Sequence, residues 1–333
     1  MLAGCSGSQP PVSAPGTMPQ TSAFATHAAR GKSWMLPEAK HDDLLYASVQ
    51  TSCCAKYSAD VFVFSYPSGK PVGELGVTAD TMFGLCSDEQ GDVFVTGFNT
   101  YTTGGSSYVY EYRHGGTKPI AKLLDPLAAD ACSVDPVTGN LAVAGWTGNQ
   151  AASLVIYSQT GGKYTGSYTP YYDSAIRWVR WCAYDTSGNL YLDGENGSGL
   201  VRLAVLHDGE FSAIDLNRSD FAPYSLQWAD DGDLVIAGYE GTIGPETLLE
   251  VQMDGTKATI VGTTILKDAG HKWGDDSQIS IKGLRIVGGG YPGDHLMAWR
   301  LHKGGHPDQR IAQTPDGWWY GVAFSLHRGR NGQ

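Results

Sequence analysis

Residues 153–168 read SLVIYSQTGGKYTGSY, in which two runs rich in aliphatic and aromatic residues flank a Gly-Gly pair. This pattern predicts a β-hairpin, because glycine adopts the positive φ angles that tight hairpin turns need. The pattern recurs in VFVFSYPSGKPVGEL (61–75), YVYEYRHGGTKPIAKL (108–123) and LLEVQMDGTKATIVG (248–262). Successive turn glycines lie 47, 46, 47, 46 and 50 residues apart: Gly69, Gly116, Gly162, Gly209, Gly255 and Gly305. A fixed period of strand–turn–strand units indicates a radially repeated sheet structure.

A second hairpin pattern alternates with the first. It reads GLCSDEQGDVFVTG (84–97), ACSVDPVTGNLAVAG (131–145), WCAYDTSGNLYLDG (181–194) and SLQWADDGDLVIAG (225–238), with a degenerate copy in ISIKGLRIVGG (279–289). We expect positive φ at the turn glycines Gly91, Gly139, Gly188 and Gly232. The aspartates that recur before these turns are expected to cap them: Asp88, Asp135 and Asp185. The second strand of each unit is nearly all apolar, as expected for a strand buried on both faces.

Two hairpins per period form a four-stranded blade, and six periods predict an all-β, six-bladed β-propeller. The first unit has a strand at Leu44–Ala47 but lacks the strand before it, and the chain ends with a strand at Tyr320–Phe324 that no hairpin follows. We therefore predict that the C-terminal strand pairs with the first blade and closes the ring, which removes an exposed edge. The expected division is a lipobox-like start and disordered tether (1–40), the propeller (41–326) and a C-terminal tail (327–333).

Composition and the N-terminal residues favour an exported protein with no affinity for nucleic acid. The net charge is −11, from 34 acidic and 23 basic residues, whereas nucleic-acid and anionic-membrane binding need basic patches. No run of about 18 apolar residues is present. Leu2-Ala3-Gly4-Cys5 resembles a bacterial lipobox, which makes Cys5 the expected lipid attachment site and places the true start of the signal upstream. A chance LAGC in a flexible tail is the alternative.

The other five cysteines are Cys53, Cys54, Cys86, Cys132 and Cys182, and none has the C-x-x-C spacing of a zinc site. Small buried residues near the propeller axis are the favoured interpretation. One disulfide among them is consistent with export, but the sequence does not indicate which two cysteines pair.

The stretch Cys182-Ala183-Tyr184-Asp185-Thr186-Ser187-Gly188-Asn189-Leu190-Tyr191-Leu192 resembles the repeat of the NHL family. The resemblance covers about residues 43–325 and implies a propeller fold, but its motif is structural and implies no activity. The chain also resembles a group of uncharacterised bacterial propeller lipoproteins, through GLCSD, CSVDP followed by GNLAV, and EYRHGGTKPIA.

In a propeller, the loops between second and third strands and those between blades gather on one face. Six of the nine tryptophans fall in such loops, and aromatic rings beside Asn and Glu suit a carbohydrate or a peptide. The alternative for each tryptophan is that it fills a gap between blades. The predicted ligand-binding residues are Asn99, Tyr101, Trp146, Tyr172, Trp178, Glu195, Asn196, Tyr239, Glu240, Trp273 and Tyr291.

Catalytic patterns are weak, and no catalytic residue is predicted. Six-bladed relatives of the gluconolactonase and regucalcin type hold a calcium or other divalent ion in the channel, but this chain lacks their matching Asn-Gly-Leu and Asn-Asp stretches. Asp193, Glu195 and Asn196 are the nearest oxygen ligands, and a solvated loop explains them equally well. His302 and His306 flank a Gly-Gly turn and are expected to be structural.

These observations favour an exported, lipid-anchored propeller of the cell envelope that binds a carbohydrate or protein partner without catalysis and without a cofactor. A metal-assisted lactonase-type hydrolase or lyase, with an ion in the central channel, is the alternative. A purely structural scaffold is a third interpretation, which side chains that plug the channel would favour.

Overall fold

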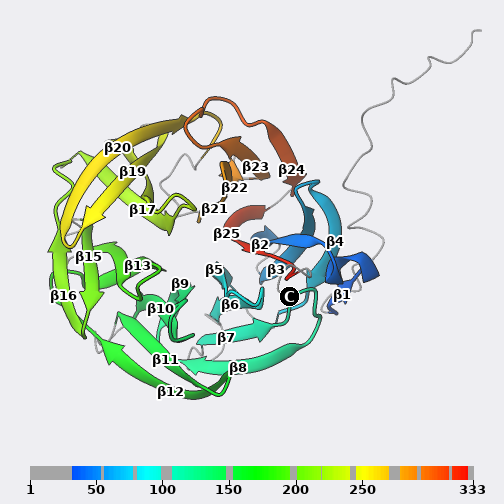
Figure 1. The fold of residues 1–333 in the computed structure, drawn as a ribbon. Coiled ribbons are helices and arrows are strands. Elements are labelled where there is room, and N and C mark those ends of the chain that lie inside the picture. Colours follow the sequence, from blue (N-terminus) through cyan, green and yellow to red (C-terminus); the bar gives the residue numbers. More distant parts are fainter. Residues whose placement is uncertain are drawn as a thin grey trace, which may run out of the picture.

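The computed structural model describes eleven segments of the chain. They are residues 32–53, 56–77, 81–98, 107–147, 153–195, 201–218, 220–240, 245–269, 278–290, 294–314 and 317–328. Six antiparallel sheets surround a central axis, which confirms the predicted six-bladed β-propeller (Figure 1). Among the residues described, no helix has the length and apolar composition needed to cross a bilayer.

Each blade contributes four strands, which follow one another from the axis outward. Blade 1 has β25 (Gly317–Ser325), β2 (Asp43–Cys53), β3 (Lys56–Tyr66) and β4 (Lys70–Leu75). Blade 2 has β5 (Thr81–Ser87), β6 (Val93–Phe98), β7 (Ser107–Tyr112) and β8 (Pro119–Asp125). Blade 3 has β9 (Ala128–Val134), β10 (Leu141–Trp146), β11 (Leu154–Thr160) and β12 (Lys163–Tyr171).

The remaining three blades follow the same order. Blade 4 has β13 (Trp178–Tyr184), β14 (Leu190–Glu195), β15 (Val201–His207) and β16 (Glu210–Ile214). Blade 5 has β17 (Phe221–Trp228), β18 (Leu234–Glu240), β19 (Glu246–Asp254) and β20 (Lys257–Leu266). Blade 6 has β21 (Ser280–Lys282), β22 (Arg285–Gly290), β23 (His295–Arg300) and β24 (Gln309–Gln313). A short strand β1 (Trp34–Met35) pairs with β4 and is followed by the 3-10 helix η1 (Pro37–Lys40).

The ring closes as predicted, by pairing of β25 with β2. The two strands are antiparallel, with Leu44 opposite Ser325. Two further hydrogen bonds join blade 1 to blade 2: Ser87 Oγ donates to Phe324 O at 2.6 Å, and Ser325 Oγ donates to Gly91 O at 2.5 Å. The last strand therefore stabilises both its own blade and the next one.

The predicted turn chemistry is confirmed at the aspartates of the second hairpin pattern. Asp185 Oδ1 accepts hydrogen bonds from Ser187 N and Asn189 N, both at 2.8 Å. Gly188 has φ +85°, a conformation that other residues adopt only with strain. Asp88 and Asp135 accept from their own turns in the same way. These side chains are committed to local structure and are not free to act on a ligand.

The second strands form the core between blades. Val93, Phe94 and Val95 are fully buried, which confirms the expectation for strands covered on both faces. Cys86 on β5 forms a disulfide with Cys132 on β9 and so links the inner strands of blades 2 and 3, with an S–S distance of 2.09 Å. Cys182 on β13 is buried and has no disulfide partner.

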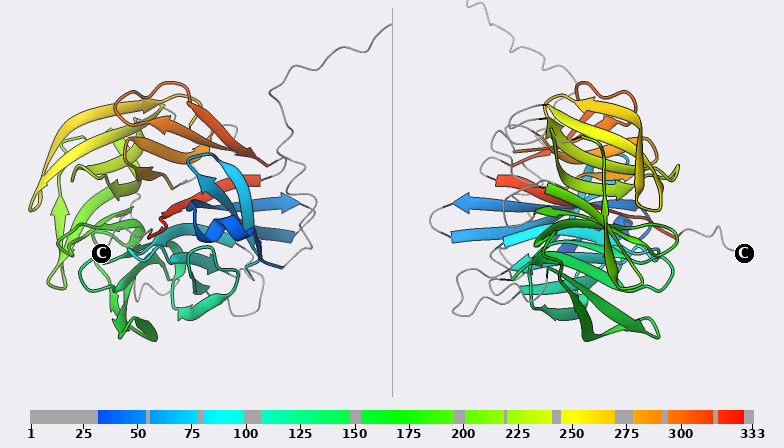
Figure 2. Two further views of the ribbon diagram at one scale, coloured as in Figure 1. Left: turned by 45° about the vertical axis from the view of Figure 1, so that its right-hand side comes forward. Right: turned by 90° about the vertical axis from the view of Figure 1, so that its left-hand side faces the viewer.

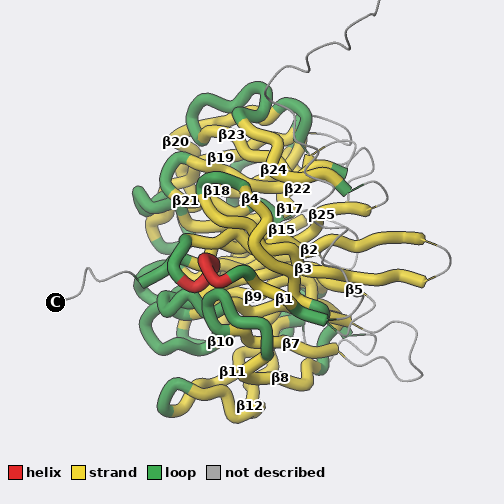
Figure 3. The backbone as a smooth tube through the Cα atoms, turned by 90° about the vertical axis from the view of Figure 1, so that its right-hand side faces the viewer, coloured by secondary structure: helices red, strands yellow, loops and turns green. Residues whose placement is uncertain are grey.

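The disc has two unlike faces (Figures 2 and 3). We call the face that carries the turns between first and second strands, and between third and fourth strands, the turn face. The opposite face, where second strands end and inner strands begin, is the loop face. Trp146, Glu195 and Glu240 end second strands and Trp178 begins an inner strand, so all four belong to the loop face.

Candidate functional site

Six of the predicted ligand-binding residues lie on described parts of the loop face: Trp146, Tyr172, Trp178, Glu195, Tyr239 and Glu240. The others lie outside the described residues, and so does the expected lipid attachment site: Asn99, Tyr101, Asn196, Trp273, Tyr291 and Cys5.

Three large aromatic side chains are exposed on adjacent blades of the loop face. The exposed fraction is 45% for Trp146 at the end of β10, 38% for Tyr172 after β12, and 41% for Trp178 at the start of β13. Rings of this size are normally buried, and a group of exposed ones on one face is a common mark of a binding surface. These three predicted residues are exposed at the junction of blades 3 and 4, and their role in ligand binding stays a prediction.

Hydrogen bonds hold the segments that carry these rings in fixed positions. Gly145 N, next to Trp146, donates to Ser153 O at 3.1 Å. Ser153 Oγ in turn donates to the carbonyl of Ile176, two residues before Trp178, at 3.4 Å. Ser153 is fully buried, so this bridge is shielded from water. The two indoles therefore project from a preorganised base that joins blades 3 and 4.

A charged pair lies beside these rings. Arg180 Nη2 is 2.7 Å from Glu195 Oε1, and both side chains are partly exposed. A β-bulge between Val179 and Trp181 accommodates Arg180, and bulges of this kind re-aim a side chain. Burial raises the pKa of the nearby Asp130 carboxyl to about 7, and the positive charge of Arg180 opposes that rise. Glu195 thus forms an ion pair and is not a free ligand.

The two predicted residues on blade 5 are separate from the aromatic group. Tyr239 stacks at a tilt against Tyr224, with 5.6 Å between ring centroids. Glu240 accepts from Arg218 Nη2 at 2.5 Å, and both side chains are on the surface. Blade 4 lies between these residues and Trp146, so the structure does not bring the whole predicted set together.

Two tryptophans that the sequence suggested for the loop face are buried instead. Trp319 is 1% exposed and packs against Phe62 and Phe64. Trp181 is 4% exposed, and an added Cβ at Gly84 would lie 3.3 Å from its indole. Since Gly84 belongs to blade 2 and Trp181 to blade 4, this indole reaches across the channel. The gap-filling alternative is therefore correct for these two residues.

The Gln278 side chain also crosses the channel. Its Oε1 accepts from Leu85 N at 3.0 Å and from Val322 N at 3.1 Å, and its Nε2 donates to Leu85 O at 2.8 Å. These contacts join blade 6 to blades 1 and 2. Nothing in the sequence pattern marks Gln278, because its partners are distant in the chain.

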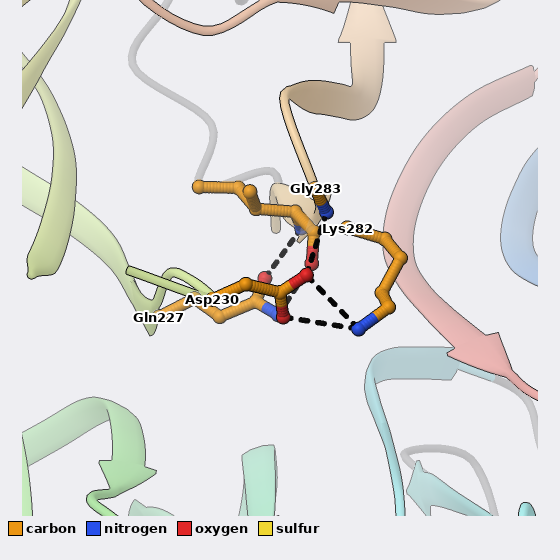
Figure 4. A network of polar contacts seen from close by, with 5 residues as sticks. Gln227, Asp230, Lys282 and Gly283 are labelled. Carbon is orange, nitrogen blue, oxygen red and sulfur yellow. Dashed lines mark hydrogen bonds and ion pairs between the residues drawn. The ribbon is translucent and has the colours of Figure 1, made fainter. Parts of the chain in front are cut away.

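A central cavity of about 330 Å³ on the turn face is lined by the inner strands of all six blades. Figure 4 shows the polar network at its rim between blades 5 and 6. Lys282 Nζ lies 3.0 Å from both carboxylate oxygens of Asp230, and Gly283 N donates to Asp230 Oδ2 at 3.0 Å. Gln227 exchanges two hydrogen bonds with the backbone of Ile281, at 2.7 and 3.2 Å.

The residues proposed for a metal in the lactonase-type alternative are engaged in other contacts. Asp193 is fully buried, its Oδ1 accepts from Trp181 N at 2.9 Å, and burial raises its pKa to about 7. Glu195 pairs with Arg180, and Asn196 lies outside the described residues. Across the eleven described segments, no three His, Cys, Asp or Glu side chains are arranged to hold a metal. The geometry does not favour this alternative.

The two histidines flanking the last hairpin turn contact different carboxylates. His302 Nδ1 is 2.8 Å from Glu250 Oε2, and His306 Nδ1 is 2.9 Å from Asp268 Oδ2. Their side chains do not converge, in agreement with a structural role.

Comparison with solved structures supports the fold. A chain of a nidogen/laminin complex is similar with a TM-score of 0.59 and 13% identity, over 86% of this chain and 98% of that one. TolB from Acinetobacter baumannii has a TM-score of 0.56 and 11% identity, over 85% of this chain and 67% of that one. A candidate 6-phosphogluconolactonase from Bacteroides fragilis has a TM-score of 0.51 and 10% identity, over 86% of this chain and 99% of that one.

At such low identities the likeness extends to the propeller architecture alone. No protein-family model matches the chain. No curated protein matches it.

Proposed function

We propose that this chain is an exported, non-catalytic binding module that recognises a protein or peptide partner through the loop face. The observation that carries the proposal is the exposure of Trp146, Tyr172 and Trp178 on a hydrogen-bonded base at the junction of blades 3 and 4. Exposed tryptophan and tyrosine side chains dominate the binding energy of many protein interfaces. The Arg180–Glu195 pair would supply polar contacts at the rim of such an interface.

Two further points support a protein partner. One of the structurally similar chains is part of a nidogen/laminin complex, so a propeller of this size can serve in protein assembly. The residues proposed for metal-assisted catalysis are held by other contacts, which weakens the enzymatic alternative.

The disulfide supports export. Disulfides persist in oxidising compartments and are rare in the reducing cytosol, and Cys86–Cys132 links two blades. Together with the lipobox-like Leu2–Cys5, this favours a lipid-anchored protein of the bacterial cell envelope. Metabolic labelling with palmitate in the native host should label the wild-type protein but not Cys5→Ser. Equal labelling of both proteins would contradict the anchor without affecting the binding proposal.

The binding proposal can be tested by selection from a displayed peptide library, with counter-selection on a Trp146→Ala/Trp178→Ala double variant. Enriched peptides should bind at least about tenfold more weakly to each single variant, as expected when an anchoring ring is removed. Tyr168→Ala is a matched control, because Tyr168 is equally exposed on blade 3 but lies in the outer strand β12. Failure to enrich any peptide, or equal affinity for all variants, would contradict the proposal.

A further inference from the structure

A polar cleft lies between blades 3 and 4 and is lined by turns of both blades on the turn face; its lining residue Tyr171 directly precedes Tyr172 of the aromatic surface. It has a volume of about 320 Å³, which is within the range of small-molecule sites. Blade 3 contributes strands β11 and β12, and blade 4 contributes the β13–β14 and β15–β16 turns. All of its lining residues are described, and none is part of the proposed partner surface.

The outer strands of the two blades differ in length. Strand β12 has nine residues, whereas β16 in the next blade has five. Strand β12 is exposed along almost its whole length, and the β11–β12 hairpin lies at the outer edge of the ring (Figure 1). Ile156 and Thr169 are register partners in this hairpin, and both line the cleft.

The walls of the cleft carry neutral hydrogen-bonding groups. They include the hydroxyls of Ser158, Thr169 and Ser187 and the side-chain amide of Asn140. Asn189 also lines the cleft, but its amide is held by Asp185 Oδ2, which accepts from Nδ2 at 2.8 Å, and by His207, 2.6 Å from Oδ1. A β-bulge between Tyr157 and Gln159 accommodates Ser158, which lines the cleft. Asn140 Oδ1 accepts from Gln159 N at 3.1 Å. This bond fixes the orientation of the side-chain amide, so its NH₂ group points away from Gln159.

Two tyrosines provide the apolar contact surface. Tyr171 and Tyr184 line the cleft and are half-buried, so each ring is held by the core while part of it is accessible. Tyr171 packs edge-on against Phe211, with 6.4 Å between centroids, which restricts its orientation. Fixed aromatic rings beside hydroxyl and amide groups suit a ligand with polar edges and apolar faces.

The charged groups of the cleft are already satisfied. Asp135 is buried and accepts from Val137 N at 2.9 Å and from the Thr138 hydroxyl at 2.5 Å. At the rim, His207 lies between Asn189 Oδ1, 2.6 Å from its Nδ1, and Asp208, 3.3 Å from its Nε2. No cationic side chain among the lining residues is left to attract an anion, and the two aspartates oppose one. The cleft is therefore suited to an uncharged ligand.

We propose that the cleft between blades 3 and 4 binds a neutral saccharide, with a hexose or N-acetylhexosamine ring against Tyr171 and Tyr184. The hydroxyls of such a ring match the serine, threonine and asparagine groups of the walls, and its apolar face matches the tyrosine rings. The lining includes the β9–β10, β13–β14 and β15–β16 turns on the turn face, and Tyr171, whose chain neighbour Tyr172 belongs to the partner surface, lies at the boundary between the two sites.

The test is titration calorimetry and saturation-transfer NMR of the full chain with maltotriose, cellotriose and chitotriose. We expect at least one of these probes to bind, and an anionic trigalacturonate to bind at least about tenfold more weakly. Thr169→Arg, which places a long side chain in the cleft, should reduce the affinity at least about tenfold. Thr165→Arg is the matched control in the same exposed strand, and it should leave the affinity for the saccharide unchanged.

Trp146→Ala should also leave saccharide binding unchanged, which separates this site from the loop face. The proposal is overturned if none of the neutral probes binds, if trigalacturonate binds as tightly as they do, or if Thr169→Arg retains wild-type affinity. Loss of binding on Trp146→Ala would move the saccharide to the loop face and would equally overturn it. Thermal unfolding of each variant verifies that the propeller is intact.

Discussion

The Gln278 side-chain amide forms two hydrogen bonds with the backbone of Leu85, accepting from its N–H at 3.0 Å and donating to its carbonyl at 2.8 Å. Leu85 lies on β5, the innermost strand of blade 2, so no further strand of its sheet pairs with it on the axis side. Blade 6 has the shortest inner strand, the three-residue β21, and Gln227 makes an equivalent pair with Ile281. Two glutamine side chains thus link the inner strand of blade 6 and the residues before it to other blades.

We predict that Gln278→Ala destabilises the propeller by about 3 kcal/mol, because it leaves the backbone N–H groups of the buried residues Leu85 and Val322 without this acceptor. Equilibrium unfolding in urea measures the change. Gln252→Ala is the matched control, since Gln252 is exposed on β19 and should contribute little. An equal effect of the two substitutions would show that the channel-crossing amide has no special role.

The disulfide between blades 2 and 3 should contribute strongly to stability. It closes a sequence separation of 46 residues, for which the loss of unfolded-state entropy corresponds to about 4 kcal/mol. We expect dithiothreitol to lower the melting temperature of the wild-type protein substantially. The Cys86→Ser/Cys132→Ser double variant should start from the lower value and show no response to the reductant. A response that persists in this variant would place the effect at another cysteine pair.

Acid should weaken the seam between blades 1 and 2 through His114. Its Nδ1 lies 2.6 Å from Ser325 Oγ, and burial, together with the nearby His327, lowers the pKa of its ring below 6.5. The unfolded chain therefore takes up this proton more readily than the folded chain. The contribution of His114 to the free energy of unfolding is fully present above about pH 6.5. It is lost as the pH decreases from there through the lowered pKa of the folded state.

We expect His114→Gln to reduce the fall in melting temperature between about pH 7 and pH 5, because the substituted side chain does not titrate. His306→Gln is the comparison, since His306 is exposed and pairs with the surface carboxylate of Asp268. If both variants keep the wild-type pH profile, the acid sensitivity has another origin.

Asp125 should have the opposite pH dependence. Burial raises the pKa of its carboxyl to about 7, and its Oδ1 accepts from Leu127 N at 3.1 Å. The folded chain keeps a proton on this group that the unfolded chain has already lost, so stability decreases as the pH rises. Between pH 5 and pH 7, this group should lower the free energy of unfolding of the wild-type protein by about 2 kcal/mol, and Asp125→Asn should abolish that decrease. Urea unfolding at the two pH values tests this, and an unchanged difference would contradict it.

Much of the fold could be predicted from the sequence, because it depends on local chemistry that repeats. Glycines such as Gly188 and aspartates such as Asp185 form turns with residues two to four positions away, so their spacing reports the strands directly. Ring closure was also predictable, because a strand without a hairpin remained at each end of the repeat.

The binding surface could be predicted only in part. Trp178 and Trp181 are three residues apart in similar sequence surroundings, yet the first is exposed and the second crosses the channel. A bulge at Arg180 separates them, and its position depends on how β13 packs between two neighbouring blades. The cleft between blades 3 and 4 could not be predicted, because its lining residues come from strands and turns of two blades that are distant in the chain.

The amino-acid sequence by itself determined the number of blades, the turn that joins each pair of strands, and the strand that closes the ring. These features depend on backbone preferences and on hydrophobic periodicity, which act over a few residues. Tertiary structure alone decided which cysteines pair, which tryptophans face solvent, and that Gln278 spans three blades. Each of these depends on the distance between segments far apart in the chain, which packing sets.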